Sequence, residues 1–156
     1  MGNYCYKTES QPLIPYRYTW TGLLSPTEIR QITPLYASAF KWPTARSSQY
    51  FSRCTTYVTG VLEWLIVYDQ KKVVAFLSLH EHPDGILLAN VVTIPSYRGR
   101  GIATEMLRKT RDRVHGERLY LQVLAEQPIL VDFYSRRGFR LLPTLTSSGR
   151  YQMVQE

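Results

Sequence analysis

Residues 97–104 read Tyr-Arg-Gly-Arg-Gly-Ile-Ala-Thr, and this stretch constrains the fold more than any other part of the chain. An apolar, β-branched segment at residues 86–94 precedes it, and a helical pattern follows it. In that pattern Ile102 and Met106 share one face, and Gly116 is a suitable C-terminal stop. The sequence therefore predicts a strand, then a basic glycine turn, then a helix.

A turn of this composition is suited to bind an anion. Gly99 and Gly101 let the backbone approach a ligand closely. The first N–H groups of a helix have no intrahelical partner, and the helix dipole favours negative charge there. The turn lacks the Gly-Lys-Ser/Thr ending of a P-loop, and Thr104 stands where a dinucleotide fingerprint has its third glycine. The sequence therefore predicts an anion site of a different type.

The pattern Arg98-x-x-Gly101-x-Ala103 resembles the pyrophosphate-binding motif of the GNAT N-acetyltransferase superfamily, Q/R-x-x-G-x-G/A. The strand that leads into it through Pro95 is also similar to the family's arrangement. By this resemblance the anion is the pyrophosphate of acetyl-coenzyme A. The residues implied to hold it are Arg98, Gly99, Arg100, Gly101, Ile102, Ala103 and Thr104.

A second stretch, residues 133–139, resembles the family's other signature, which is a tyrosine on a short helix that ends in Gly-Phe. It follows an apolar strand pattern at residues 119–124, as in the family. The two signatures occur in the family's order and at its separation. The resemblance extends over roughly residues 62–139 and implies the GNAT fold, in which a mixed, mostly antiparallel sheet is flanked by helices and splayed at its central strands.

The resemblance also implies roles for the central strand. In the family, backbone groups of this strand bind the pantetheine arm, and one N–H faces the thioester carbonyl; Val92 and Ile94 take those roles here. A fixed N–H donor at that place stabilises the oxyanion that forms when an amine attacks a thioester. Gln127 stands where the family often has asparagine, seven positions before the tyrosine, which implies a further hydrogen bond to pantetheine.

Within the second signature, the resemblance implies that Tyr134 is catalytic. The leaving group is a thiolate whose thiol has a pKa of about 8.5, and a phenol with a pKa near 10 can hydrogen-bond or protonate it. Many family members carry a glutamate early in the central strand as general base, whereas residues 86–89 offer none. Direct attack by a neutral amine, or deprotonation through water, needs no such side chain, so the sequence names no base.

Length and composition predict a single domain over residues 1–156, which the resemblance implies is an N-acetyltransferase domain, and the cysteine usage predicts a reducing cytoplasm. The chain is 44% hydrophobic, and no apolar run approaches the roughly 20 residues of a membrane helix. Residues 1–10 lack the apolar segment of a signal peptide. Cys5 and Cys54 form neither a disulfide framework nor a CxxC motif, and neither lies near the two signatures, which disfavours a covalent route through cysteine.

The remaining patterns predict further elements. Ser25, Pro26 and Glu28 predict a capped helix start, and Pro34 predicts a kink or an end of that helix. Residues 41–53 are either an ordinary loop and second helix or, as in the family, part of the acceptor pocket. The other predictions are strands at residues 16–21, 63–68, 73–80, 140–145 and 151–154, and a turn at residues 80–85. The His80–His82 pair in that turn has no supporting cluster, so no metal site is predicted.

The function predicted from the resemblance is transfer of acetyl from acetyl-coenzyme A to a primary amine, by direct attack in a ternary complex. A small molecule or a protein is the default acceptor. The net charge of +7 also allows tRNA, as in GNAT-type toxins that acetylate aminoacyl-tRNA. A non-catalytic domain that binds coenzyme A or nucleic acid is the alternative of a different class. Homodimerisation, the acceptor's identity and the biological role are left open.

Overall fold

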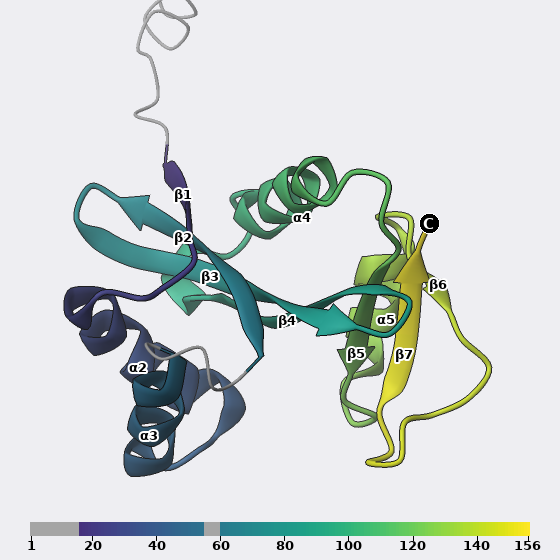
Figure 1. The fold of residues 1–156 in the computed structure, drawn as a ribbon, viewed down its shortest axis with the longest axis horizontal. Helices are drawn as coiled ribbons and strands as arrows, with labels where there is room; N and C mark the ends of the chain where they lie inside the picture. Colours follow the sequence, from purple (N-terminus) through teal and green to yellow (C-terminus); the bar gives the residue numbers. More distant parts are fainter. Residues whose placement is uncertain (1–15, 55–59) are drawn as a thin grey trace, which may run out of the picture.

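Seven strands form one sheet in the computed structural model of the protein, which describes residues 16–54 and 60–156 (Figure 1). The strand order is β1-β2-β3-β4-β5-β7-β6, and β4 and β5 are the one parallel pair among the described strands. The predicted mixed, mostly antiparallel sheet is therefore confirmed. The strands are β1 (Arg17–Thr21), β2 (Val61–Asp69), β3 (Lys72–His82), β4 (Gly85–Thr93), β5 (Leu119–Val123), β6 (Arg140–Leu141) and β7 (Tyr151–Gln155).

Helices cover both faces of the sheet (Figure 1). Side chains alternate along β2: Trp64 and Ile66 pack with one apolar cluster, and Leu65 and Val67 with the other. The first cluster includes residues of α2 (Pro26–Phe40) and α3 (Thr44–Cys54). The second includes residues of α4 (Ile102–Arg113) and α5 (Pro128–Ser135), and the 3-10 helix η1 (Pro95–Tyr97) links β4 to the turn before α4.

The start of α2 is the predicted capping box. The Ser25 hydroxyl accepts a hydrogen bond from the Glu28 N–H, and the Glu28 carboxylate accepts one from the Ser25 N–H. Pro34 does not end the helix, which continues to Phe40. The helix tolerates the missing N–H because the turn around Pro34 is held to the sheet by a buried face that includes Ile32 and Tyr36.

The sheet opens between β4 and β5, as predicted. These strands pair at Ile86–Leu88 with Leu119–Leu121 only, although β4 continues to Thr93. On the other side of β4, the ladder with β3 contains a bulge, since Phe76 pairs with Val92 but Ser78 pairs with Ala89. Asn90 lies in the bulge with a left-handed φ of 57°. The sheet therefore presents unpaired backbone at the C-terminal half of β4.

Other predicted boundaries need correction. The predicted β2–β3 hairpin is confirmed, but β3 runs to His82, because His82 still pairs with Gly85 in the ladder. The strand predicted at 140–145 has only two residues in β6. Pro143, which has no N–H, follows soon after and cannot extend the ladder.

Some predictions concern residues at the margin of the described structure. The signal-peptide prediction for residues 1–10 and the thiol of Cys5 lie outside the described residues. Cys54 ends α3, and its side chain also lies outside them. Within the described ranges, no helix has both the length and the apolar character needed to cross a membrane.

Candidate active site

The basic glycine turn between η1 and α4 is anchored from two sides. The Tyr97 hydroxyl donates to the Asp69 carboxylate in the β2–β3 turn. The Arg100 guanidinium donates to the Tyr16 hydroxyl at 2.9 Å and to the Ser96 carbonyl at 3.1 Å, and it lies over the Tyr97 ring. Arg100 therefore braces the turn, and it is not among the residues that line the cavity below.

The two turn glycines leave the backbone open. Gly99 and Gly101 have φ values of 76° and 81°, which are readily adopted by glycine alone. A Cβ built on either would meet no described heavy atom within 4 Å. Gly101 is the N-cap of α4, whose first hydrogen bond runs from the Glu105 N–H to the Gly101 carbonyl. The N–H groups of residues 102–104 are thus free of intrahelical partners at the positive end of the helix dipole.

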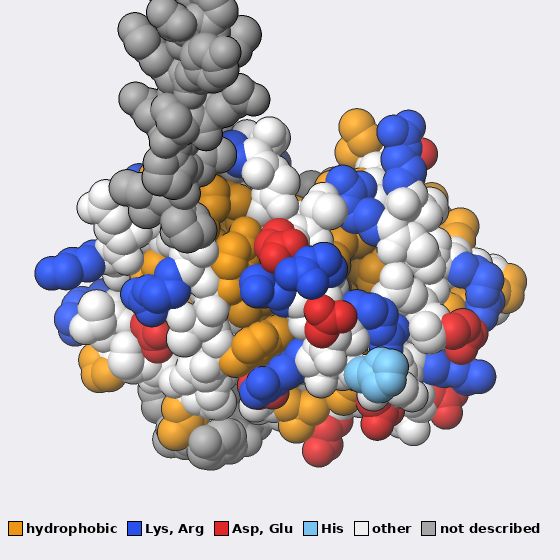
Figure 2. Space-filling view, turned by 90° about the horizontal axis from the view of Figure 1, so that it is seen from above, with side chains coloured by type: hydrophobic (Ala, Val, Ile, Leu, Met, Phe, Trp, Pro, Cys, Tyr) orange, Lys and Arg blue, Asp and Glu red, His pale blue; other side chains and the backbone are white. Residues whose placement is uncertain are grey.

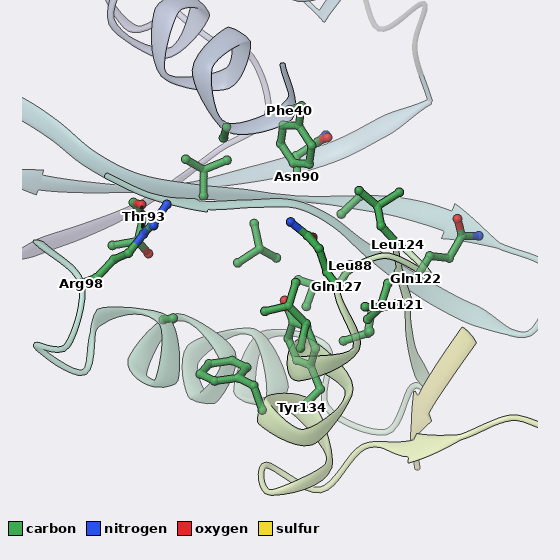
Figure 3. Close-up of a pocket in the computed structure, with 18 of the residues that line it drawn as sticks. Phe40, Leu88, Asn90, Thr93, Arg98, Leu121, Gln122, Leu124, Gln127 and Tyr134 are labelled. Atoms are coloured by element: carbon green, nitrogen blue, oxygen red, sulfur yellow. Dashed lines mark hydrogen bonds between the residues drawn. The ribbon is translucent and has the colours of Figure 1, made fainter. Parts of the chain in front are cut away.

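A cavity of about 970 Å³ occupies the opening between β4 and β5 and extends to this turn. Figure 3 shows Arg98 and Thr93 at one end, with Gln127 and Tyr134 further along and Phe40 and Asn90 on the α2 side. Of the residues predicted from the sequence, the structure brings nine together along its wall. They are Val92, Arg98, Gly99, Gly101, Ile102, Ala103, Thr104, Gln127 and Tyr134.

The backbone of β4 is oriented differently from the prediction for Val92 and Ile94. The Ile94 N–H donates to the Val74 carbonyl of β3 at 3.0 Å, and Ile94 does not line the cavity. Alternate residues of an antiparallel ladder direct their backbone groups to the same neighbour, so those of Val92 also face β3. Thr93 faces the opening, where its carbonyl accepts a hydrogen bond from Arg98 Nε at 3.1 Å. The structure thus offers Thr93 for backbone contacts with a ligand, and the ligand contacts of Val92 and Ile94 stay predictions.

Gln127 and Tyr134 lie at the two ends of the short helix α5. Gln127 is the residue before it, and its side-chain amide forms no hydrogen bond within residues 16–54 and 60–156. Tyr134 is 8% exposed, and its ring packs edge-on against Phe133 and Phe139. Its hydroxyl also has no hydrogen-bond partner in the described part of the chain. Both polar groups are therefore available to a ligand in the cavity.

Burial keeps the Tyr134 hydroxyl protonated. Loss of solvent raises its pKa to about 12, and the nearby Arg137 acts in the opposite direction. The Arg137 guanidinium donates to the Thr104 hydroxyl at 3.0 Å and to the Phe133 carbonyl at 2.8 Å, so it joins α5 to the first turn of α4. This joint fixes the tyrosine relative to the anion turn.

The α2 side of the cavity lies outside the two signatures, although the sequence allowed residues 41–53 as part of an acceptor pocket, as in the family. Tyr36, Phe40 and Trp42 line it from α2 and the turn that follows, and Asn90 lines it from β4. The Asn90 amide donates to Ser78 Oγ at 2.8 Å and to the Tyr50 hydroxyl at 3.1 Å. Aromatic residues at helical spacing usually belong to a core, so their sequence pattern does not indicate a binding surface. Their position beside the β4 bulge shows that Tyr36, Phe40 and Trp42 form one wall of the cavity.

The predicted His80–His82 pair serves other contacts. His80 Nε2 lies 2.8 Å from Ser78 Oγ, and burial lowers the pKa of its imidazole. The His82 ring stacks on Tyr120 at a centroid distance of 3.8 Å. Among the described residues, no group of three or more His, Cys, Asp or Glu side chains is placed to hold a metal ion.

Much of the positive charge on the exposed face of α4 is paired. Arg108 bonds Glu105 at 2.7 Å and Asp112 at 3.1 Å, and Arg113 bonds Glu63 at 2.6 Å. Figure 2 shows acidic and basic side chains mixed over this face. A paired, mixed surface is a poor footprint for nucleic acid, which favours a continuous cationic one.

A sheet splayed beside a basic glycine turn, with a buried tyrosine across the opening, defines the GNAT class of acyltransferases. The model of the acetyltransferase (GNAT) family matches residues 28–139, and the chain belongs to this family. The resemblance read from the two signatures is thereby confirmed. No curated protein sequence gives a significant match to the chain.

Solved structures support the same fold at low sequence identity. An acyl-CoA N-acyltransferase from Pseudomonas aeruginosa is 18% identical, with a TM-score of 0.68 over 91% of this chain and 100% of that one. The PaiA N-acetyltransferase of Thermoplasma acidophilum, solved with coenzyme A, is 14% identical, with a TM-score of 0.69 over 90% and 99%. The ribosomal-protein-S18-alanine N-acetyltransferase of Escherichia coli is 20% identical, with a TM-score of 0.67 over 89% and 93%.

Proposed function

We propose that the protein is an acetyl-coenzyme A-dependent N-acetyltransferase that acetylates a primary amine by direct attack in a ternary complex. The observation that carries this proposal is one continuous cavity that joins the anion turn to Tyr134 through the opening of the sheet. The coenzyme A bound to the Thermoplasma acidophilum relative of the same fold supports this choice of donor.

The residues along the cavity fit the donor's chemical parts in sequence. The N–H groups of residues 102–104 and the Arg98 side chain match a pyrophosphate, which needs several donors and a positive field. The side-chain amide of Gln127 and the backbone of Thr93 match the amide groups of pantetheine. Tyr134 then lies on the wall beyond them, where a thioester sulfur would follow pantetheine.

The chain's own groups would assist the transfer at two points. The amine nitrogen forms a bond to the acetyl carbon, the carbon–sulfur bond breaks, and the amine loses one proton. Tyr134 gives its proton to the departing sulfur and recovers one from the proton lost by the amine, so that the reaction is balanced. The donor that we assign to the developing oxyanion is the N–H of Val91, which lines the cavity two positions before Thr93 on β4.

The direct test is release of free thiol from acetyl-coenzyme A in the presence of panels of amines and peptides. We expect release that requires an amine and yields an equal amount of acetylated product, measured by mass spectrometry. Calorimetry with coenzyme A accompanies it. Tight binding of coenzyme A without thiol release for any amine, peptide or charged tRNA would instead identify a non-catalytic binding domain.

Salt dependence separates a small amine from tRNA as acceptor. At saturating acetyl-coenzyme A, we expect the Michaelis constant for a small amine to change less than about 3-fold between 50 and 200 mM salt, because few counterions are released. A tRNA held by six or more phosphate contacts would lose roughly 10³-fold in affinity over the same range. Steep salt dependence with charged tRNA, together with acetylation of its amino group, would overturn the small-molecule assignment.

A further inference from the structure

We propose that the acceptor is a monoamine carried by a flat, apolar group, and that Asn90 positions its nitrogen by accepting a hydrogen bond from it. This inference rests on the proposed acetyl transfer and names the substrate class of that same site. It is carried by three features of the α2 side of the cavity, which are an aromatic wall, the absence of acidic lining and the hydrogen bonds of Asn90.

The aromatic wall is formed by Tyr36, Phe40 and Trp42, which all line the cavity. Its rings support one another: the Tyr36 centroid lies 4.6 Å from that of Phe40 and 5.2 Å from that of Trp42. Behind them, Tyr50 stacks on Tyr36 at 5.6 Å. Rings held this way present a preformed flat surface, which favours an apolar and preferably aromatic ligand.

The charges along the cavity disfavour a second positive group on the acceptor. Among the described residues that line it, none is acidic, whereas Arg98, Arg137 and Arg150 are basic. A polyamine would therefore bury an ammonium group with no carboxylate partner among the described lining residues. A monoamine that reacts in its neutral form avoids this cost.

Asn90 is held in a defined orientation next to the wall. Its amide nitrogen donates to Ser78 Oγ and to the hydroxyl of Tyr50, so both of its N–H bonds are used. The single proton of Ser78 Oγ has other acceptors, since the hydroxyl lies 2.8 Å from His80 Nε2 and donates to the Ala89 carbonyl at 3.3 Å. Ser78 must then accept from Asn90, which places the amide nitrogen, not the oxygen, on this side.

The Asn90 carbonyl oxygen is therefore the polar atom that is left for a ligand. It can accept a hydrogen bond from an amine N–H but cannot donate one, so it leaves the nitrogen lone pair free for the acetyl carbon. The residue lies in the β4 bulge, beside the strand segment that borders the opening. An amine held there approaches from the α2 side, and Tyr134 lies across the opening, as Figure 3 shows.

The substrate class is tested with a panel of three amines in the thiol-release assay. Phenethylamine has one amine and a ring, butylamine has one amine and no ring, and spermidine has several amines and no ring. We expect kcat/KM for phenethylamine to exceed both others by about 100-fold or more, as burial of a ring against the wall predicts. Equal or higher kcat/KM for spermidine would overturn the proposal.

Two tryptophans provide a matched pair of variants for the wall. Trp42 and Trp20 are both half-buried, and each lies under an arginine, at 3.9 Å for Arg46 and 5.2 Å for Arg113. Only Trp42 lines the cavity. We expect Trp42→Ala to reduce kcat/KM for phenethylamine at least about 10-fold more than for butylamine. Trp20→Ala should leave that ratio unchanged, and a ratio that is also unchanged in Trp42→Ala would overturn the role of the wall.

Asn90→Gly is the variant that tests the nitrogen contact, because glycine adopts the left-handed φ of 57° and removes only the side chain. We expect the Michaelis constant for phenethylamine to rise about 10-fold, the usual effect of one lost hydrogen bond in a buried site. The dissociation constant of acetyl-coenzyme A should stay within about 2-fold. An unchanged acceptor constant in a folded, active Asn90→Gly protein overturns this inference alone, whereas wild-type protein that releases no thiol overturns the proposed function.

Discussion

Replacing Gly101 with glutamate is expected to weaken acetyl-coenzyme A binding by at least about 100-fold, or about 2.8 kcal/mol. Gly101 has a φ of 81° and open space where a side chain would project, at the N-terminus of α4. A carboxylate there would occupy the space that we assign to the pyrophosphate and add like charge beside it. It would also disturb the N–H groups of the first turn, and charged hydrogen bonds of that kind are each worth about 1.5–3 kcal/mol. Calorimetry with acetyl-coenzyme A measures the change.

Gly116→Glu is the control for backbone strain. Gly116 follows the other end of the same helix, has a φ of 87°, and would also place a Cβ more than 4 Å from any described heavy atom. Both variants should lose similar thermal stability, because both force a side chain into the left-handed region. Only Gly101→Glu should lose acetyl-coenzyme A. Wild-type affinity in a folded Gly101→Glu protein would show that the turn does not hold the phosphates.

The parts of the fold that depend on neighbouring residues could be predicted from the sequence. The capping box needs only Ser25 and Glu28, three positions apart, and both of its hydrogen bonds are present. The strand, glycine turn and α4 likewise follow from consecutive residues, and the turn is open as expected at Gly99 and Gly101. Local patterns of this kind are decided by steric and hydrogen-bonding rules within a few residues.

The orientation of β4 could not be predicted in the same way. When a strand shifts by one residue, the backbone groups that faced one neighbouring strand are replaced by those that faced the other. Here the bulge opposite Leu77 adds a residue to β4, and its position depends on pairing with β3. The motif alone does not show which of residues 92–94 direct their backbone toward the opening, so the ligand contacts of Val92 and Ile94 stay predictions, and Thr93 is the residue whose carbonyl lies against Arg98.

The aromatic wall was predicted only in part, since residues 41–53, which include Trp42, were allowed as part of an acceptor pocket. Phe40 and Trp42 come before β2 in the chain, whereas Asn90 comes from β4 and Arg150 from the residue before β7. Nothing in the sequence sets the distance between these segments, which only the folded sheet brings together. At Pro34 a local rule predicted a kink or an end of the helix. Instead α2 continues to Phe40, because its buried face packs on the sheet.

Replacing Tyr134 with phenylalanine is expected to lower turnover by roughly 10²–10⁴-fold, the usual share of a general acid. The ring and its edge-on contacts with Phe133 and Phe139 are kept, and only the hydroxyl is lost. Affinity for acetyl-coenzyme A should change far less, because the hydroxyl matters mainly as negative charge builds on sulfur. Turnover under saturating substrates and calorimetry with acetyl-coenzyme A separate these two effects.

The pH dependence of turnover gives a second measure of the same group. A general acid acts in its protonated form, so its contribution is lost as pH rises through its pKa, which burial raises to about 12 for Tyr134. Turnover of the wild type should therefore rise with pH as the amine loses its proton and show no descending limb up to about pH 10. A descending limb near pH 8–9 in a stable protein would assign the proton to a different group.

Tyr68→Phe is the matched control, because Tyr68 is also 8% exposed and lies on β2, outside the residues that line the cavity. Loss of its hydrogen bond to Glu28 should lower the melting temperature without lowering turnover. Circular dichroism and thermal melting must show that both variants are folded.

Turnover within a few-fold of wild type in a stable Tyr134→Phe protein would return Tyr134 to a packing role. The proton for the departing thiolate would then come from water. Burial raises the pKa of the Tyr134 phenol, but burial alone does not show that the phenol donates a proton in the reaction.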